Sequence, residues 1–137
     1  MNANLLEIFQ HRMDTAAAEQ IWSVAILGSL NAFVITKATE LRRALTEAKA
    51  VWGVRIVTAL VCLFIWSRHG VYWFYSRQHD AVIELAPSSH LSNLTWIETA
   101  ARFGVIWSGV VLYTAICVGM ALASIRVLKE VPLDDNA

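Results

Sequence analysis

Residues that could do chemistry gather between positions 65 and 80, in the stretch IWSRHGVYWFYSRQHD. Its two histidines are potential ligands for a metal or a haem. His69 and His79 are ten residues apart, whereas zinc sites favour short spacings, and no acidic residue joins them or His90 in a known motif. A haem held by two histidines needs imidazoles facing each other across a bundle, but all four histidines lie outside the apolar segments. We therefore expect no metal and no cofactor.

Catalytic motifs are equally hard to find in the rest of the chain. Asp80 and Glu84 are four residues apart and could share a site, but a solvated helix face explains them equally well. The sequence has no nucleophile elbow, Gly-rich phosphate loop or His-Glu-x-x-His motif. Cys62 and Cys117 both lie inside apolar runs, where cysteine behaves as a small buried residue. We expect a protein without catalytic residues, which is not an enzyme.

The elements that would hold these residues must suit an unusually apolar chain. Hydrophobic residues make up 57% of the 137 positions and charged residues 16%, against about 45–50% and about 25% in soluble domains. Residues 103–125 form a run of 23 positions without a charge, and about 20 apolar residues are enough to cross a bilayer as a helix. The net charge is zero and no basic tract is present, so we expect no nucleic-acid partner.

The positions of charges and turn formers divide the chain into seven expected segments. These are an amphipathic helix over 4–20, a first span over 21–36, a cytoplasmic helical hairpin over 37–50, a second span over 51–67, an interfacial helix and loop over 68–93, a third span over 95–126 and a polar tail over 127–137. Together they form a single membrane domain, 1–137. The predicted fold class is all-α: an integral membrane helical bundle with three transmembrane helices plus amphipathic interfacial helices.

The stretch quoted above then has a simpler interpretation, as the place where the second span leaves the membrane. Its aromatic residues are typical of an interfacial belt, namely Trp66, Tyr72, Trp73, Phe74 and Tyr75. A helix continued through the stretch gathers polar residues on its other side, namely His69, Arg77, Asp80 and Glu84. This polar side either meets water and headgroups or binds another protein, and the sequence leaves both open.

Small residues recur at helical spacing in the first and third spans. The positions predicted for helix packing or assembly are Ala25, Gly28, Ala32, Gly104, Ser108, Ala115, Gly119 and Ala123. Such stripes let helices approach closely in lipid, where packing rather than exclusion of water drives association. They serve either the contacts within one chain or those between chains. Three short helices bury little area against one another, which favours assembly with other chains.

Uncharged polar residues occur at membrane depth, at Ser29, Asn31 and Thr114. Polar groups in a span usually face protein or water, so these residues either form hydrogen bonds between helices or line a pore. Arg55 and Arg102 lie near the ends of the spans, and no charge lies deep enough for a proton relay. This pattern disfavours a pump or a coupled transporter.

The basic residues indicate an orientation. With three spans, one side carries seven of them, namely Lys37, Arg42, Arg43, Lys49, Arg55, Arg126 and Lys129, and the other side carries four. The positive-inside rule places the N-terminus outside and the C-terminus in the cytoplasm. We expect a multi-pass protein of the cell (inner) membrane, whose partners are the lipid bilayer and either copies of itself or other membrane subunits.

Two functions fit these expectations. The first is a structural or accessory subunit that assembles through its small-residue faces into a homo-oligomer or a larger membrane complex. The alternative is an oligomeric pore-forming or membrane-permeabilising protein. The three-span plan with an external N-terminus resembles that of some phage holins, which implies the second function. The resemblance concerns topology alone, and the acidic tail KEVPLDDNA departs from the basic tail usual in that family.

Overall fold

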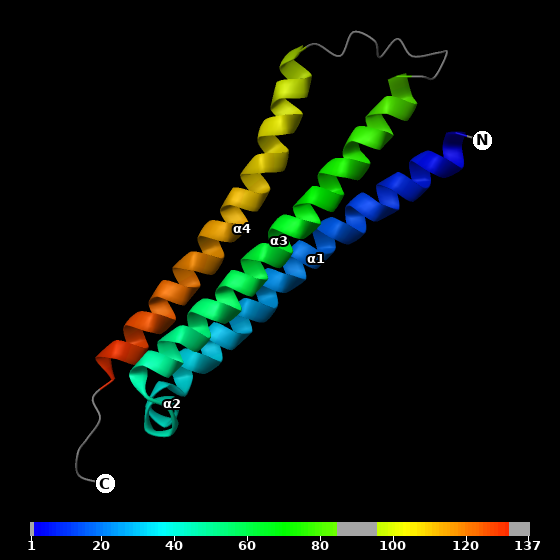
Figure 1. Ribbon diagram of the computed structural model, residues 1–137. Coiled ribbons are helices and arrows are strands. Elements are labelled where there is room, and N and C mark those ends of the chain that lie inside the picture. Colours follow the sequence, from blue (N-terminus) through cyan, green and yellow to red (C-terminus); the bar gives the residue numbers. More distant parts are fainter. Residues whose placement is uncertain (1, 85–95, 132–137) are drawn as a thin grey trace.

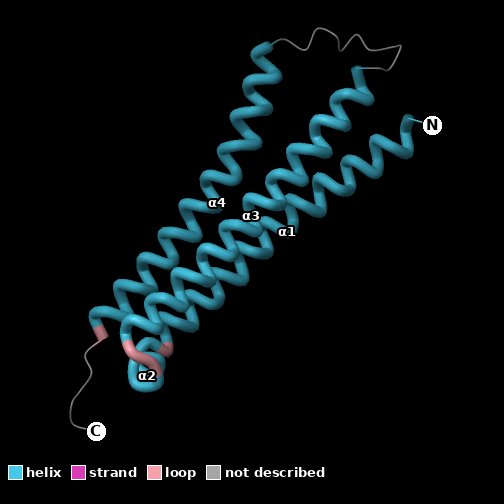
Figure 2. Tube along the Cα trace, in the orientation of Figure 1, coloured by secondary structure: helices cyan, strands magenta, loops and turns pink. Residues whose placement is uncertain are grey.

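The computed structural model describes residues 2–84 and 96–131, with side chains over 4–82 and 107–131. The described residues form four helices: α1 (Asn2–Thr36), α2 (Ala38–Ala44), α3 (Glu47–Glu84) and α4 (Trp96–Glu130) (Figure 1). They contain no strand (Figure 2). Three of the helices are long and apolar enough to cross a membrane, over Asn4–Thr36, Glu47–Val82 and Trp107–Glu130. The predicted all-helical class with three membrane-spanning lengths is confirmed to this extent.

The three long helices lie lengthwise against one another. The N-terminal end of α1, the C-terminal end of α3 and the N-terminal end of α4 lie at one end of the molecule (Figure 1). We call this the open end, and the opposite end, where α2 lies beside the C-terminal end of α4, the α2 end. All three long helices contact each other, and the contact between α1 and α3 is the most extensive.

Both α1 and α3 continue past the spans expected from the sequence. The helix α1 runs unbroken from the expected amphipathic segment 4–20 into the expected span 21–36, and α3 runs unbroken past Ser67 to Glu84. No proline lies between residues 2 and 84 to interrupt either helix. The extensions also contact each other, since Arg68 Nε lies 3.1 Å from Glu19 Oε2 and the rings of Phe9 and Tyr75 are 6.0 Å apart. Residues 4–20 and 68–84, which we expected to be amphipathic and interfacial, are therefore continuations of long helices, and the expected loop up to residue 93 lies outside the described residues.

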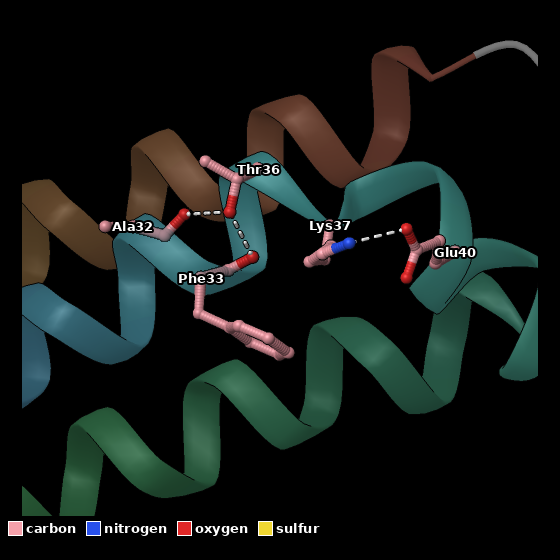
Figure 3. Close-up of polar contacts among 5 residues, drawn as sticks. All are labelled: Ala32, Phe33, Thr36, Lys37 and Glu40. Atoms are coloured by element: carbon pink, nitrogen blue, oxygen red, sulfur yellow. Dashed lines mark hydrogen bonds and ion pairs between the residues drawn. The ribbon is translucent and has the colours of Figure 1, made fainter.

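The turn between α1 and α3 contains the short helix α2. At the end of α1 the Thr36 hydroxyl donates to the carbonyls of Ala32 and Phe33, at 2.9 and 3.1 Å (Figure 3). Lys37 follows, and its Nζ lies 2.8 Å from Glu40 Oε1 on α2 (Figure 3). Such local bonds from threonine often bend a helix, which suits a chain that must turn back here.

The core is a narrow seam where the three long helices meet. One cluster joins Leu27 of α1, Ile65 of α3, and Val110 and Cys117 of α4, and a second joins Ala38, Ala50 and Leu128 at the α2 end. The outer surface is also apolar, with exposed side chains that include Ile21, Trp22, Ile26, Leu60, Leu63, Val111, Leu112, Val118 and Leu122. Exposed apolar area on this scale suits contact with lipid tails.

Candidate functional site

Asn31 and Ser124 form a buried polar contact between α1 and α4. Ser124 is 0% exposed and Asn31 is 5% exposed. The Ser124 hydroxyl donates to Asn31 Oδ1 at 2.5 Å, and Asn31 Nδ2 donates to the Leu27 carbonyl at 2.8 Å. Both ends of the Asn31 amide are thus used within one chain. The bond to Ser124 is an interhelical hydrogen bond, one of the two roles that the sequence allows for Asn31.

The other two polar residues predicted at membrane depth, Thr114 and Ser29, differ in their contacts. Trp66 Nε1 of α3 donates to Thr114 Oγ1 of α4 at 3.1 Å, and Thr114 donates to the Val110 carbonyl at 2.8 Å. Ser29 donates to the carbonyl of Ala25 at 3.0 Å in its own helix and is exposed. Asn31 and Thr114 therefore join helices, while Ser29 lies on the outer surface of α1.

His69 lies inside the molecule, although the sequence places it on an exposed polar side of its helix. It is 5% exposed, and its ring centre lies 4.9 Å from that of Trp107 on α4. Its Nε2 has no hydrogen-bond partner within the described part of the chain. His69 is buried because α4 packs against its side of α3. The polar side expected from the sequence is therefore divided between the interior and the surface of the molecule.

The remaining residues expected on that polar side do not form a common site with His69. Arg77 is exposed, with its guanidinium carbon 5.3 Å from the centre of the Trp73 ring. Asp80 Oδ1 lies 3.6 Å from His79 Nδ1. Glu84 ends α3, but its side chain lies outside the described ones, as does His90. Within the described side chains, no three His, Cys, Asp or Glu residues come together as metal ligands.

The expected aromatic anchors lie all around α3. Trp66, Trp73 and Phe74 are exposed, while Tyr72 and Tyr75 are half-buried. Tyr75 contacts Phe9 of α1, and its ring centre is 5.4 Å from that of Phe74. These aromatics therefore combine a surface role with packing between helices.

The small residues of α4 face away from the other helices. Ala115 and Gly119 each lie two residues from Cys117, hence about 200° around the helix from it. Cys117 is 0% exposed and belongs to the core, whereas Ser108, Ala115, Gly119 and Ala123 are all exposed. A Cβ built on Gly119 meets nothing within 4 Å. We call these four residues the outward α4 face; Gly104 lies in α4 before the described side chains.

On α1 the small residues are divided. A Cβ built on Gly28 would lie 3.5 Å from Met120 Sδ of α4, so Gly28 sits where these two helices approach. Ala25 and Ala32 are exposed. Packing within one chain thus accounts for Gly28, whereas the exposed small residues include Ala25, Ala32, Ala115, Gly119 and Ala123.

Three polar contacts between helices involve residues that the sequence did not single out. Gln20, which is buried, donates through Nε2 to the Ile65 carbonyl of α3 at 3.3 Å. Ser124 and the pair formed by Glu19 and Arg68 are the others. A signal existed for Gln20, because helical spacing places it on the same side of α1 as Leu27 and Asn31.

Comparison with known proteins leaves the function to be argued from this geometry. No family model matches the chain. No solved structure matches it either.

Proposed function

We propose that this chain is a non-enzymatic structural subunit of a membrane assembly, and that copies of the chain associate through the outward α4 face. The observation that carries the proposal is the direction of Ala115 and Gly119, which lie on the opposite side of α4 from buried Cys117. A stripe of small residues turned away from a chain's own core leaves room for a helix of another chain.

The physical case rests on what drives association in lipid. Lipid tails are as apolar as leucine, so helices associate through close packing, which small residues permit. Glycine inside a helix costs about 1 kcal/mol relative to alanine, and no contact within the described part of the chain fills the space beside Gly119. Close approach of a second helix would offset that cost.

The pore alternative has less support. Asn31 forms one hydrogen bond through each end of its amide and Thr114 accepts from Trp66, so both residues are engaged in contacts inside one subunit. Ser29 is exposed, but its hydroxyl donates to a carbonyl of its own helix. An association of whole subunits through α4 leaves these internal contacts undisturbed. A larger complex with other membrane proteins would use the same outward α4 face.

The proposed orientation places the α2 end in the cytoplasm of an inner membrane. The positive-inside rule supports it, because Lys37, Arg42, Arg43, Lys49 and the cations near the end of α4 all belong to that end. The N-terminus then lies outside, together with the extensions of α1 and α3.

The proposal is tested by the mass of the purified protein and by its conductance in liposomes. We expect a discrete oligomer, and we expect Gly119→Leu to reduce it to single chains because leucine holds the partner helix away. Gly70→Leu is the matched control, since a Cβ on this glycine of α3 also meets nothing within 4 Å. An unchanged mass in Gly119→Leu contradicts the proposal. A steady ion current altered by Ser29→Ala favours the pore instead.

A further inference from the structure

A groove runs between α1 and α3 at the α2 end. Its volume is about 200 Å³, and its walls include Leu30 and Phe33 of α1, Leu41 of α2, and Gly53 and Val57 of α3. Figure 3 shows the Phe33 ring projecting from α1 toward α3. Leu30, Phe33 and Val57 are exposed, so the groove opens on the outer surface of the molecule. Leu128 of α4 also lines the groove, but none of the residues of the outward α4 face does.

The walls of the groove are almost entirely apolar. Leu27 and Leu128 close its inner side, and the Asn31 amide that lines it forms one hydrogen bond through each of its ends. A Cβ built on Gly53 meets nothing within 4 Å, so this glycine leaves space in the wall. An apolar chain suits this interior, whereas a polar ligand would find few groups to bind.

The edge of the groove carries positive charge. Segment 37–55 has five cations and two anions, and both anions are occupied: Glu40 by Lys37 at 2.8 Å and Glu47 by Arg42 at 3.3 Å. Lys49 lines the groove, is exposed, and has no ion pair with any residue in the described ranges. The groove therefore combines an apolar interior with the Lys49 ammonium group, which pairs with no described acidic residue, at its edge.

We propose that this groove binds an anionic phospholipid of the surrounding bilayer, with one acyl chain along Phe33 and Gly53 and the phosphate at Lys49. Lys49 lies in the first turn of α3, near the end of the apolar length, where headgroups meet water. Basic residues near the cytoplasmic surface attract anionic lipids. The apolar walls favour an acyl chain, and Lys49 favours a negatively charged headgroup.

The test is native mass spectrometry of the purified full-length protein, titrated with dioleoyl phosphatidylglycerol or dioleoyl phosphatidylcholine. We expect one phosphatidylglycerol per chain to bind at least fivefold more tightly than phosphatidylcholine. Lys49→Gln should weaken phosphatidylglycerol binding about fivefold and leave phosphatidylcholine unchanged. Lys129→Gln is the matched control, because Lys129 is exposed at the same end but does not line the groove.

A second variant tests the apolar part. Gly53→Leu should weaken both lipids because it fills the groove, while Gly70→Leu on the same helix should not. Equal binding of the two lipids, or equal effects of Lys49→Gln and Lys129→Gln, would overturn the proposal. Displacement of the lipid by soluble glycerol phosphate at the same concentration as by phosphatidylglycerol would also overturn it, because it would show that the acyl chain adds nothing to binding. The number of lipids bound per protein chain is independent of the oligomer mass. Failure of the lipid-binding proposal can therefore be distinguished from failure of the proposed assembly.

Discussion

Asn31 contributes to stability through its bond with Ser124, and a double-mutant cycle measures that contribution. Interhelical hydrogen bonds in membrane proteins contribute about 0.6 kcal/mol on average and up to about 1.7. We expect Asn31→Ala and Ser124→Ala to show a coupling energy of about 1 kcal/mol in reversible unfolding from detergent, because the Ser124 hydroxyl is 0% exposed. Ser29→Ala, which removes an exposed local bond, should change stability by less than about 0.5 kcal/mol. Strictly additive effects of the pair would refute the contact.

His69 is a buried residue whose imidazole we expect to lower the stability of the fold. Its Nε2 has no hydrogen-bond partner within the described residues, and an unsatisfied buried polar group costs about 1–3 kcal/mol. We expect His69→Leu to raise the free energy of unfolding by about 1 kcal/mol, since leucine fills the space beside Trp107 without that cost. Gln20→Leu is the contrasting variant: it should lower stability, because Gln20 donates to the Ile65 carbonyl. A loss of stability in His69→Leu would contradict this expectation.

At the scale of the element, the continuity of α1 is the feature that a single substitution can test. Ala18 is exposed and lies in the middle of this helix. We expect Ala18→Pro to cost about 3 kcal/mol or more, because proline removes a hydrogen bond and clashes with the preceding turn. Ala18→Ser keeps the backbone hydrogen bond and introduces no clash, so it should be nearly neutral. If the proline variant unfolds like the parent, the chain breaks near residue 20 and two separate helices exist there.

The sequence predicts the elements better than it predicts their joins. The charge-free run 103–125 and the apolar residues 21–36 identify two spans, because few other structures accommodate so long a stretch without charge. The charges at Glu7, Arg12 and Asp14 suggest a separate surface helix, yet nothing in the chain stops α1 from continuing. Helix continuity depends on contacts with a neighbour, here with Tyr75 and Arg68 of α3.

The same limit applies to the candidate site. Spacing alone identifies the small residues of α4, but not whether they face the core or the lipid. That distinction depends on which side of α4 meets α1 and α3. The burial of Cys117 identifies this side, but it is known only from the packed structure. His69 illustrates the opposite error, since its polar neighbours suggested a surface position for a residue that packs on Trp107.

At the scale of the whole molecule, the helices are longer than a bilayer requires. The 35 residues of α1 extend about 52 Å, against a hydrocarbon core of about 30 Å. Along their length α1 and α3 contact each other, through the pair of Glu19 with Arg68 near their middles and the rings of Phe9 and Tyr75 closer to the open end. A molecule of this shape has a thin core and a large lipid-facing surface, which favours burial of more area by association.

The most direct test of the proposed assembly is oxidative cross-linking in native membranes. In a chain whose two native cysteines are replaced by alanine, Ala115→Cys places one thiol on the outward α4 face. Leu60→Cys is the control, because it is exposed on α3 away from that face. We predict that Ala115→Cys forms a covalent dimer of twice the 15.3 kDa chain mass, whereas Leu60→Cys stays at 15.3 kDa. Equal cross-linking of the two variants, or none in Ala115→Cys, would contradict assembly through this face.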